Sequence, residues 1–263
     1  MTDSSDKNNT MHILLTNDDG IFAPGLAAIY RRLTTLGEVT VAAPSDIQSG
    51  AGHSISLKEI RGEYIRIAGK FDGYSISGSP ADCVKLAIHK LIDARKPVDL
   101  VVSGLNHGAN VGINVFYSGT VAGAIEAAFY NLPAIAVSAA FDEPMDFEAA
   151  SDAALSVIRQ LMDLPRGCVA NLNIPRLSAG TPKGILVVPQ STHGFDEGYE
   201  VRTDGAGQQV YKLTGGGHRD PKGSGWTDTI ALAEGYITLT CLRKDLTDPD
   251  GNRLLGQKQL LYP

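Results

Sequence analysis

The chain has 263 residues, of which 43% are hydrophobic and 20% charged, a composition typical of a globular protein that buries a large core. Its formal net charge is −6 and Lys and Arg form no run, which argues against a nucleic-acid polymer as partner. The sequence holds no apolar run near the roughly 18 residues of a membrane span, and residues 1–10 are polar. We therefore expect no membrane partner, a cytoplasmic location, a disordered tail over residues 1–10 and a single domain over 11–263.

Short apolar segments alternate with segments of helical periodicity along most of the chain. Behind Pro24, for example, Leu26, Ile29 and Leu33 recur at helical spacing. Near-continuous apolar strands that alternate with helices predict an α/β fold with a mostly parallel sheet covered by helices on both faces. The predicted strands cover residues 12–16, 39–44, 98–104, 133–140 and 168–175, and the main predicted helices cover 25–37, 80–92, 121–132 and 149–162.

Two intervals depart from this alternation. Residues 55–77 alternate polar and apolar side chains with period two, which predicts a hairpin or edge strands. Residues 190–234 are rich in Gly and polar residues and show no helical period. We interpret 190–234 as a projecting β-rich arm that has no core of its own and is suited to clasp a second subunit.

The first predicted strand ends in Asn17-Asp18-Asp19-Gly20. These residues are common in tight turns, so a simple turn is one interpretation. However, adjacent carboxylates repel each other unless a cation or a proton intervenes. Later strands also end in oxygen-bearing side chains, Ser49 in one loop and Asn106 and Asn110 in another, and ligands bind at this edge of such sheets. Hard oxygen donors of this kind favour Mg²⁺ or Mn²⁺.

Several related chemistries lack their motifs. A phosphatase that forms an aspartyl-phosphate needs Asp-x-Asp-Gly after the first strand, but Asn17 stands where the nucleophile would be. There is neither a Walker A sequence nor a GxGxxG after a strand, so nucleotide triphosphate hydrolysis and dinucleotide binding have no support.

Ser118-Gly119-Thr120 begins an apolar helical segment. Hydroxyls and free backbone N–H groups at a helix N-terminus can bind phosphate, but Ser and Thr are also common helix caps, and both interpretations stay open. We expect Glu126 to be solvated or to support the site indirectly, and His53 and His107 to be loop residues or indirect supports of the site rather than the general base. The three cysteines, Cys83, Cys168 and Cys241, lie far apart in sequence, and we expect buried free thiols.

The segments ILLTNDDGIFAPG, APSDIQSGAGHS, GSPADCV, VVSGLNHGANVG, YSGTVAGAIEA and GWTDTIALAEGYITLTCL together resemble the survival protein SurE family of 5′/3′-nucleotidases, over about residues 12–247. The resemblance implies a Rossmann-like fold with an oligomerisation arm, a homodimer or homotetramer, and one divalent metal ion per subunit, Mg²⁺ or Mn²⁺. It implies hydrolysis of nucleoside 5′- and 3′-monophosphates, with short polyphosphate a further candidate substrate. It places Asp18 and Asp19 at the catalytic centre, Asp18, Asp19, Ser49 and Asn106 on the metal, and Asn110, Ser118, Gly119 and Thr120 near the phosphate.

Some positions depart from the family pattern. Asn114 stands where relatives usually have Asp, Phe22 replaces a residue that is commonly polar, and Cys241 and Arg243 lie in a segment that often reads Thr-Pro-Leu. None of these is a predicted metal ligand, so they bear on substrate preference and on acid–base roles. Two other classes of function remain: a regulator that binds metal and nucleotide without turnover, and an oligomeric scaffold whose polar strand ends are only turns.

Overall fold

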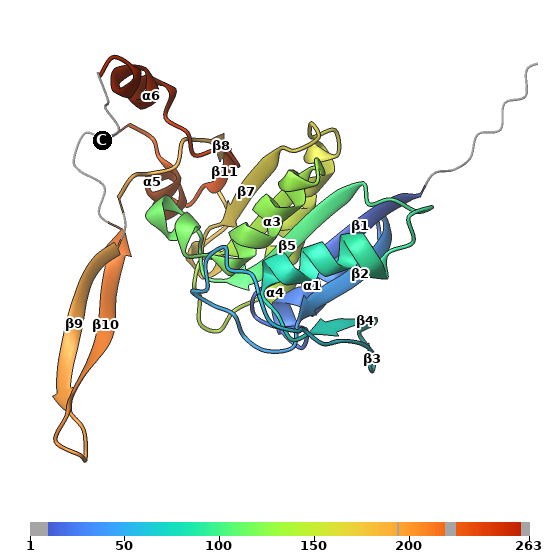
Figure 1. The fold of residues 1–263 in the computed structure, drawn as a ribbon, viewed down its shortest axis with the longest axis horizontal. Coiled ribbons are helices and arrows are strands. Elements are labelled where there is room, and N and C mark those ends of the chain that lie inside the picture. The colour runs from blue at the N-terminus through green and yellow to red at the C-terminus, as the bar shows by residue number, and fades with distance from the viewer. Residues whose placement is uncertain (1–9, 194, 219–224, 259–263) are drawn as a thin grey trace, which may run out of the picture.

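The computed structural model describes residues 10–193, 195–218 and 225–258 (Figure 1). The tail predicted over residues 1–10 lies, apart from Thr10, outside these ranges. Within them, a nine-stranded sheet has the order β3-β4-β2-β1-β5-β6-β7-β11-β8. Its strands are β1 (Met11–Thr16), β2 (Gly37–Pro44), β3 (Gly62–Ile67), β4 (Phe71–Ile76), β5 (Leu100–His107), β6 (Ala134–Ala139), β7 (Val169–Ile174), β8 (Ile185–Val187) and β11 (Ile237–Leu242).

The strands pair mostly in parallel, as the sequence predicts. Only the β3–β4 and β7–β11 pairs in this described sheet are antiparallel. The hairpin of β3 and β4 confirms the expectation for residues 55–77, and Gly69 at φ +72° forms its turn. The helices are α1 (Pro24–Leu33), α2 (Pro80–Leu86), α3 (Gly119–Phe129), α4 (Phe147–Ile158), α5 (Asp228–Ala233) and α6 (Pro249–Gly256). In the described ranges, no helix has the length and apolar character needed to span a membrane.

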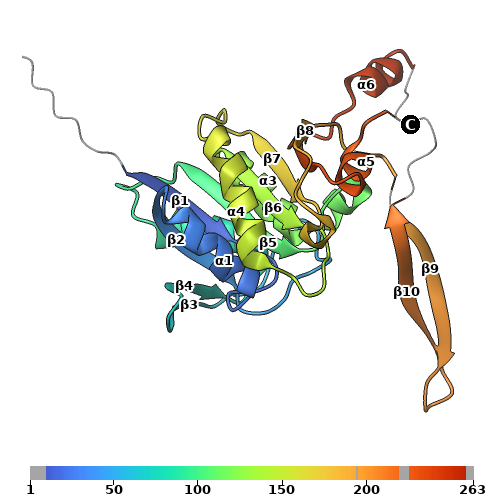
Figure 2. The same ribbon diagram turned by 180° about the vertical axis from the view of Figure 1, so that it is seen from behind.

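Helices cover both faces of the sheet and bury a separate apolar core on each (Figures 1 and 2). Because successive side chains of a strand point to opposite faces, β1 contributes to both cores. Ile13 and Leu15 pack with α1 and α4, whereas Leu14 packs with α2 and α3. Leu26, Ile29 and Leu33 of α1 are all buried, which confirms the helical stripe predicted behind Pro24.

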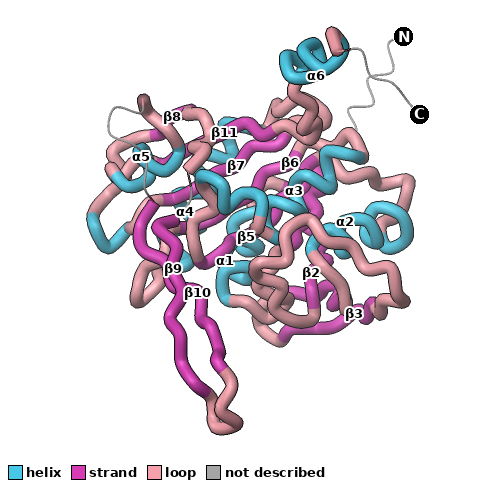
Figure 3. The backbone as a smooth tube through the Cα atoms, turned by 60° about the vertical axis from the view of Figure 1, so that its left-hand side comes forward, coloured by secondary structure: helices cyan, strands magenta, loops and turns pink. Residues whose placement is uncertain are grey.

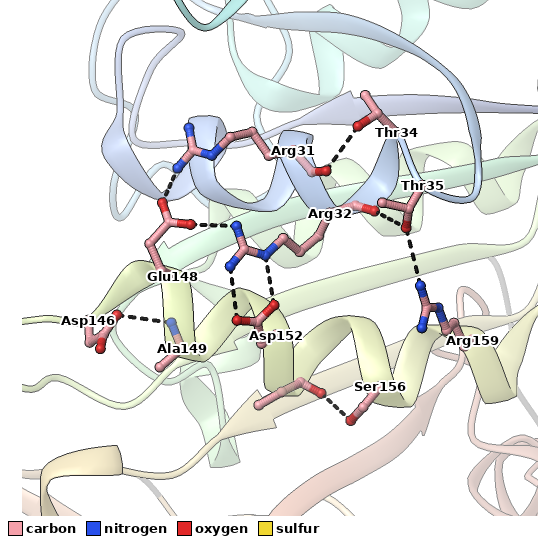
Figure 4. Close-up of polar contacts among 11 residues, drawn as sticks. Arg31, Arg32, Thr34, Thr35, Asp146, Glu148, Ala149, Asp152, Ser156 and Arg159 are labelled. Atoms are coloured by element: carbon pink, nitrogen blue, oxygen red, sulfur yellow. Dashed lines mark hydrogen bonds and ion pairs between the residues drawn. The ribbon is translucent and has the colours of Figure 1, made fainter.

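Ion pairs join α1 to α4 along the outside of their contact (Figure 4). The Arg32 guanidinium donates from Nε to Asp152 Oδ1 at 2.8 Å and from Nη2 to Oδ2 at 2.9 Å. Arg31 and Arg32 also both pair with Glu148. Exposed pairs typically contribute at most about 1 kcal/mol each, so burial of the apolar stripes remains the main reason that these helices dock.

The arm is an antiparallel hairpin of β9 (Phe195–Thr203) and β10 (Gln209–His218), which form a two-stranded sheet of their own (Figure 3). It is shorter than the arm predicted over residues 190–234, because 228–233 form α5, whose Ala231 and Leu232 are buried. This helix has only six residues, too few to show a clear period, and the Thr227 side chain caps it by accepting from the Ile230 N–H.

Candidate functional site

The chain moves in opposite directions across the sheet on either side of β1. β2 lies on one side of β1 and β5 on the other, so the crossovers diverge at the carboxyl ends of these strands. Crevices at such switch points are where α/β proteins bind ligands. Asp18 and Asp19 directly follow β1, Ser49 follows β2, and Asn106 lies near the end of β5. The predicted metal ligands therefore come from the strands at this switch point.

The turn after β1 is formed without its two carboxylates. Asn17 donates from Nδ2 to the Gly20 carbonyl at 3.0 Å, and Gly20 takes φ +93°, a conformation that favours glycine. The Ile21 N–H then donates to the Pro44 carbonyl at the end of β2, at 2.8 Å. Since Asn17 supplies the side-chain hydrogen bond of the turn, turn formation does not account for Asp18 and Asp19.

Asp18 is almost completely buried, with 4% of its surface exposed, against the start of α3. The Thr120 hydroxyl donates to Asp18 Oδ1, and the backbone N–H groups of Gly119 and Thr120 face the same carboxylate. Burial nevertheless raises the pKa of Asp18 above its ordinary value, although these hydrogen bonds oppose the shift. The start of α3 lies so close to Asp18 that a Cβ added at Gly119 would be only 2.8 Å from Asp18 Cβ.

Asp19 is half-buried beside Asp18. Burial, reinforced by the charge of Asp18, raises the pKa of Asp19 to about 6. Among the described residues, His107 opposes this rise in pKa. Its backbone N–H donates to Asp19 Oδ2 at 3.4 Å. The His107 ring stacks on Phe141 with 4.7 Å between the ring centroids, and the expectation that it is not the base stays a prediction. Two adjacent carboxylates with raised pKa values form a site that a cation would stabilise.

Ser49 and Asn106 flank this pair. The Gln48 N–H donates to the Asp18 carbonyl at 2.7 Å, which fixes the exposed turn containing Ser49 beside the end of β1. Asn106 donates from Nδ2 to the Gly108 carbonyl at 2.7 Å, so its amide is oriented with Oδ1 as the atom suited to a cation. In the part of the chain that the structure describes, no three His, Cys, Asp or Glu side chains cluster as a metal site. A site here depends on two carboxylates with Ser and Asn.

The predicted phosphate residues divide between two places. Ser118 caps α3, its Oγ accepting from the Val121 N–H at 3.1 Å, and Gly119 and Thr120 form the first turn. The cap interpretation of Ser118 is therefore confirmed, and phosphate binding by this turn stays a prediction. Asn110 lies instead over the ends of β6 and β7, where its Nδ2 donates to Ser138 Oγ at 2.8 Å and its N–H donates to Asn173 Oδ1 at 2.8 Å.

Sequence reasoning missed the residues that hold Asn110. Asn171 and Asn173 of β7 both donate to its carbonyl, at 2.7 and 3.2 Å, and Ser138 comes from β6. All three are completely buried. Two asparagines at alternate positions of an apolar strand share one face of the sheet, which was an available signal that this face carries a polar network.

A buried carboxylate anchors the loop that carries Ser49. Glu126 of α3 is 2% exposed and accepts from Lys85 Nζ at 2.5 Å, while His53 Nε2 lies 2.8 Å from its other oxygen. The structure thus contradicts a solvated Glu126, and the alternative, that it supports the site indirectly through the loop of Ser49, stays a prediction. Burial raises the pKa of Glu126, but the hydrogen bonds from His53 and Lys85 outweigh burial and hold that pKa below its usual range. His53 also stacks on Phe129, with ring centroids 5.7 Å apart.

We expect Glu126→Ala to lower the free energy of unfolding by about 2–3 kcal/mol, because it leaves Lys85 and His53 without their shared partner. Glu126→Gln keeps the hydrogen bonds and should lose about 1 kcal/mol. Since the Glu126 pKa is depressed in the folded state, its contribution is present above the unfolded pKa and is lost as the pH falls through the folded value. Urea unfolding of both variants and the wild type, at neutral and acidic pH, measures this, and equal stability of Glu126→Ala and wild type would contradict it.

A cavity of about 500 Å³ borders the N-terminus of α3. Its wall includes His53, Phe116, Ser118, Phe129 and Leu242. It is mainly apolar, and Ser118, the residue before Gly119, lies in its wall.

The cysteines differ from the expectation of three separate buried thiols. Cys83 is completely buried, but Cys168 is half-buried and Cys241 exposed, and their Sγ atoms lie 3.5 Å apart. The pairing of β7 with β11 brings them together across 73 residues of sequence. Spacing along the chain carries no sign of this strand pairing.

Known proteins share both the sequence and the architecture of this chain. The family model described as survival protein SurE matches residues 13–197. The 5′-nucleotidase SurE of Rhodopirellula baltica is 43% identical over 243 residues, covering 91% of this chain and 95% of the relative. The protein of the same name from Syntrophobacter fumaroxidans is 41% identical over 256 residues, covering 95% of this chain and 100% of the relative.

The solved structures agree with the sequence relatives. The SurE protein from Aquifex aeolicus superposes with a TM-score of 0.78 at 34% identity, covering 94% of this chain and 100% of that one. These matches confirm the resemblance carried by the NDDG, SGLNHGAN and YSGTV segments. The chain belongs to the survival protein SurE family.

Proposed function

We propose that the protein is a divalent-metal-dependent phosphatase that hydrolyses nucleoside monophosphates to nucleoside and phosphate. The observation that carries the proposal is the carboxylate pair at the end of β1, of which Asp18 is held against the N-terminus of α3. The two carboxylates suit a cation, and the N-terminus of α3 suits a phosphate. The names of the relatives, 5′-nucleotidase SurE, support the same reaction.

The donor set fits a hard divalent ion. Asp18, Asp19, Ser49 and Asn106 would hold one Mg²⁺ or Mn²⁺ per subunit through oxygen atoms, and its charge would offset the burial and the repulsion from Asp18 that raise the pKa of Asp19. When bound, such an ion lowers the pKa of a coordinated water and neutralises charge on a phosphoryl group. Asp18 and Asp19 are the catalytic residues of this proposal because they would hold that ion at the reacting centre.

The protein's own groups would bind and orient the phosphate. The N–H groups of Gly119 and Thr120 and the Thr120 hydroxyl lie at the positive end of the α3 dipole, where they face the Asp18 carboxylate, and a phosphate would bind beside that carboxylate at the same helix end. Asn110 lies over the ends of β6 and β7, and its predicted place near the phosphate is part of this proposal. Because Asn17 occupies the place of an aspartate nucleophile and is engaged in the turn, we infer direct hydrolysis without a covalent intermediate.

Exposed aromatic side chains near the proposed site suit a nucleobase. Phe22, Phe116 and Tyr117 are 63%, 58% and 56% exposed, and Phe116 also lines the apolar cavity beside Ser118. Stacking on such rings contributes affinity for any base and little discrimination among bases. We expect nucleoside 5′- and 3′-monophosphates as substrates. Short polyphosphate is a further candidate substrate.

Phosphate release tests the proposal. Metal-stripped protein is assayed with AMP, 3′-AMP and p-nitrophenyl phosphate, before and after addition of Mn²⁺ or Mg²⁺. We expect release only after a metal is added. The alternative function, a regulator that binds metal and nucleotide without turnover, predicts binding of AMP and metal with no release from any substrate, and that result would replace the phosphatase proposal. The scaffold alternative predicts neither binding nor release.

We also propose that the arm joins subunits into a homodimer or homotetramer. Tyr199, Val201, Tyr211 and Leu213 form exposed cross-strand pairs on one face of the β9–β10 ribbon, Tyr211 opposite Val201 and Leu213 opposite Tyr199. An isolated two-stranded ribbon is only marginally stable in water, so a second apolar surface would stabilise it.

Replacing Tyr211 with lysine should therefore weaken the oligomer by about tenfold or more in dissociation constant, since a charge would replace an aromatic side chain in the interface. Lys212→Gln, on the opposite face of the same strand, is the matched control and should leave assembly unchanged. Sedimentation velocity over a range of concentrations measures both. A wild type that stays monomeric throughout would contradict the arm's role.

A further inference from the structure

Cys168 and Cys241 form a pair of thiols in direct contact. Cys168 immediately precedes β7 and Cys241 lies within β11, and the antiparallel register sets Cys241 opposite Ala170 and Leu242 opposite Val169. Their Sγ atoms are 3.5 Å apart. Side chains at such diagonal positions of an antiparallel pair approach closely enough to interact. A disulfide bond would require the two sulfur atoms to move closer through a small movement at the start of β7. Gly167, directly before Cys168, has φ +74° and belongs to the loop that leads into this strand.

The pair is open to small reagents on one side. Cys241 is exposed and lines the 500 Å³ cavity beside Ser118, whereas Cys168 is half-buried behind it. Burial, and then the neighbouring thiol, raises the pKa of Cys168 to about 11. Cys241 is the better entry point for a reagent because it is the more exposed thiol. Cys83 is completely buried among the side chains packed between the sheet and the α2–α3 face, and burial raises its thiol pKa as well.

We propose that Cys168 and Cys241 are a reversible dithiol–disulfide site, oxidised by low-molecular-weight disulfides that enter through the cavity. The Cys241 thiolate attacks one sulfur of the reagent RSSR, forming a Cys241–S–SR bond and releasing RS⁻. The Cys168 thiol then loses its proton and attacks the Cys241 sulfur, releasing a second RS⁻ and forming the protein disulfide. The two protein thiols are oxidised, one RSSR is reduced to two RSH, and the two protons end on the released thiols.

The bond would tie β11 to the start of β7 at the wall of the cavity. It closes a loop of more than seventy residues in the unfolded chain, and such a cross-link is expected to raise the Tm of a domain of this size by about 4–16 °C. This effect is independent of the phosphatase proposal, because it needs neither metal nor substrate.

Oxidised glutathione provides the test. The wild-type protein is incubated with it, and intact mass and peptide mapping are recorded beside the thermal unfolding curve. We expect the loss of two hydrogens, a Cys168–Cys241 peptide link, a higher Tm, unmodified Cys83, and full reversal by dithiothreitol. Cys168→Ser should retain glutathione on Cys241, because no second thiol can displace it, and Cys241→Ser should react at neither position.

Three results would overturn the proposal. The first is a wild type that stays unmodified under conditions that oxidise free cysteine. The second is a wild type that keeps glutathione on Cys241 as Cys168→Ser does, and the third is a disulfide that joins two chains. Should either serine variant fail to fold, the peptide map and Tm of the wild type still decide between a bond within the chain and none.

Discussion

Replacing Asp19 with asparagine is expected to abolish phosphate release and, in metal-free buffer at pH 7.5, to stabilise the fold. The fall in kcat/KM should be about 10³-fold or more, because a metal ion contributes several kcal/mol to transition states of this kind and the variant removes one of its two charged ligands. The fold should persist because asparagine has nearly the same shape and can still accept from the His107 N–H.

The expected gain in stability follows from the direction of the pKa shift. The Asp19 pKa is about 6 in the folded protein, against an ordinary value of 3.8 that applies to the unfolded chain. The folded state therefore holds its proton to higher pH, and wild-type stability should fall as the pH rises from below 4 to above 6. The full shift corresponds to about 3 kcal/mol, which we reduce to about 1–2 kcal/mol because Asp19 is partly solvated.

Urea unfolding in EDTA at pH 3.5 and pH 7.5 measures this difference. Asp19→Asn should lose less stability than the wild type over the same interval. Added Mn²⁺ should raise the Tm of the wild type and leave that of the variant nearly unchanged, since only the wild type has both carboxylates. An equal metal-induced rise in the two proteins would contradict the assignment of Asp19 as a ligand.

Gly119→Ala is expected to lower activity while it disturbs the end of β1. The added Cβ would lie 2.8 Å from Asp18 Cβ and 3.1 Å from Asp18 Oδ2, closer than side-chain atoms normally approach. Either α3 or the Asp18 side chain must move, so we expect about a 10²-fold fall in kcat/KM and a loss of about 1–3 kcal/mol in stability. Replacing glycine with alanine in a helix ordinarily stabilises the helix by up to about 1 kcal/mol. A loss of stability in Gly119→Ala would therefore come from the close contact with Asp18.

Gly256→Ala is the matched control, because Gly256 ends α6 and a Cβ there would meet open space. It should leave both activity and stability close to wild type. Steady-state kinetics with AMP and urea unfolding of both variants give the comparison. A fully active Gly119→Ala protein would show that the approach of α3 to Asp18 is unimportant to the site.

Much of the fold could be predicted because its signals are local. The stripe of Leu26, Ile29 and Leu33 and the apolar run of β1 follow from helix and strand periods within a few residues. The general geometry of parallel sheets then brings Asp18, Asp19, Ser49 and Asn106 to one edge.

The features that could not be predicted depend on strand order and on packing between distant segments. The thiol contact of Cys168 with Cys241 requires the antiparallel placement of β11 beside β7, and the partners of Glu126 come from a loop and from α2. Asn110 was expected at the phosphate from a resemblance in sequence. Its hydrogen bonds to β6 and β7 became visible only once the sheet was assembled.

The central claim is that the ends of β1, β2 and β5 hold a divalent ion beside the N-terminus of α3. Anomalous scattering from crystals grown with Mn²⁺ and phosphate tests this most directly. The account predicts one manganese peak per chain, bounded by Asp18, Asp19, Ser49 and Asn106, with phosphate density against Gly119 and Thr120. Crystals of active protein with manganese bound elsewhere, or with no manganese at this edge of the sheet, would contradict it.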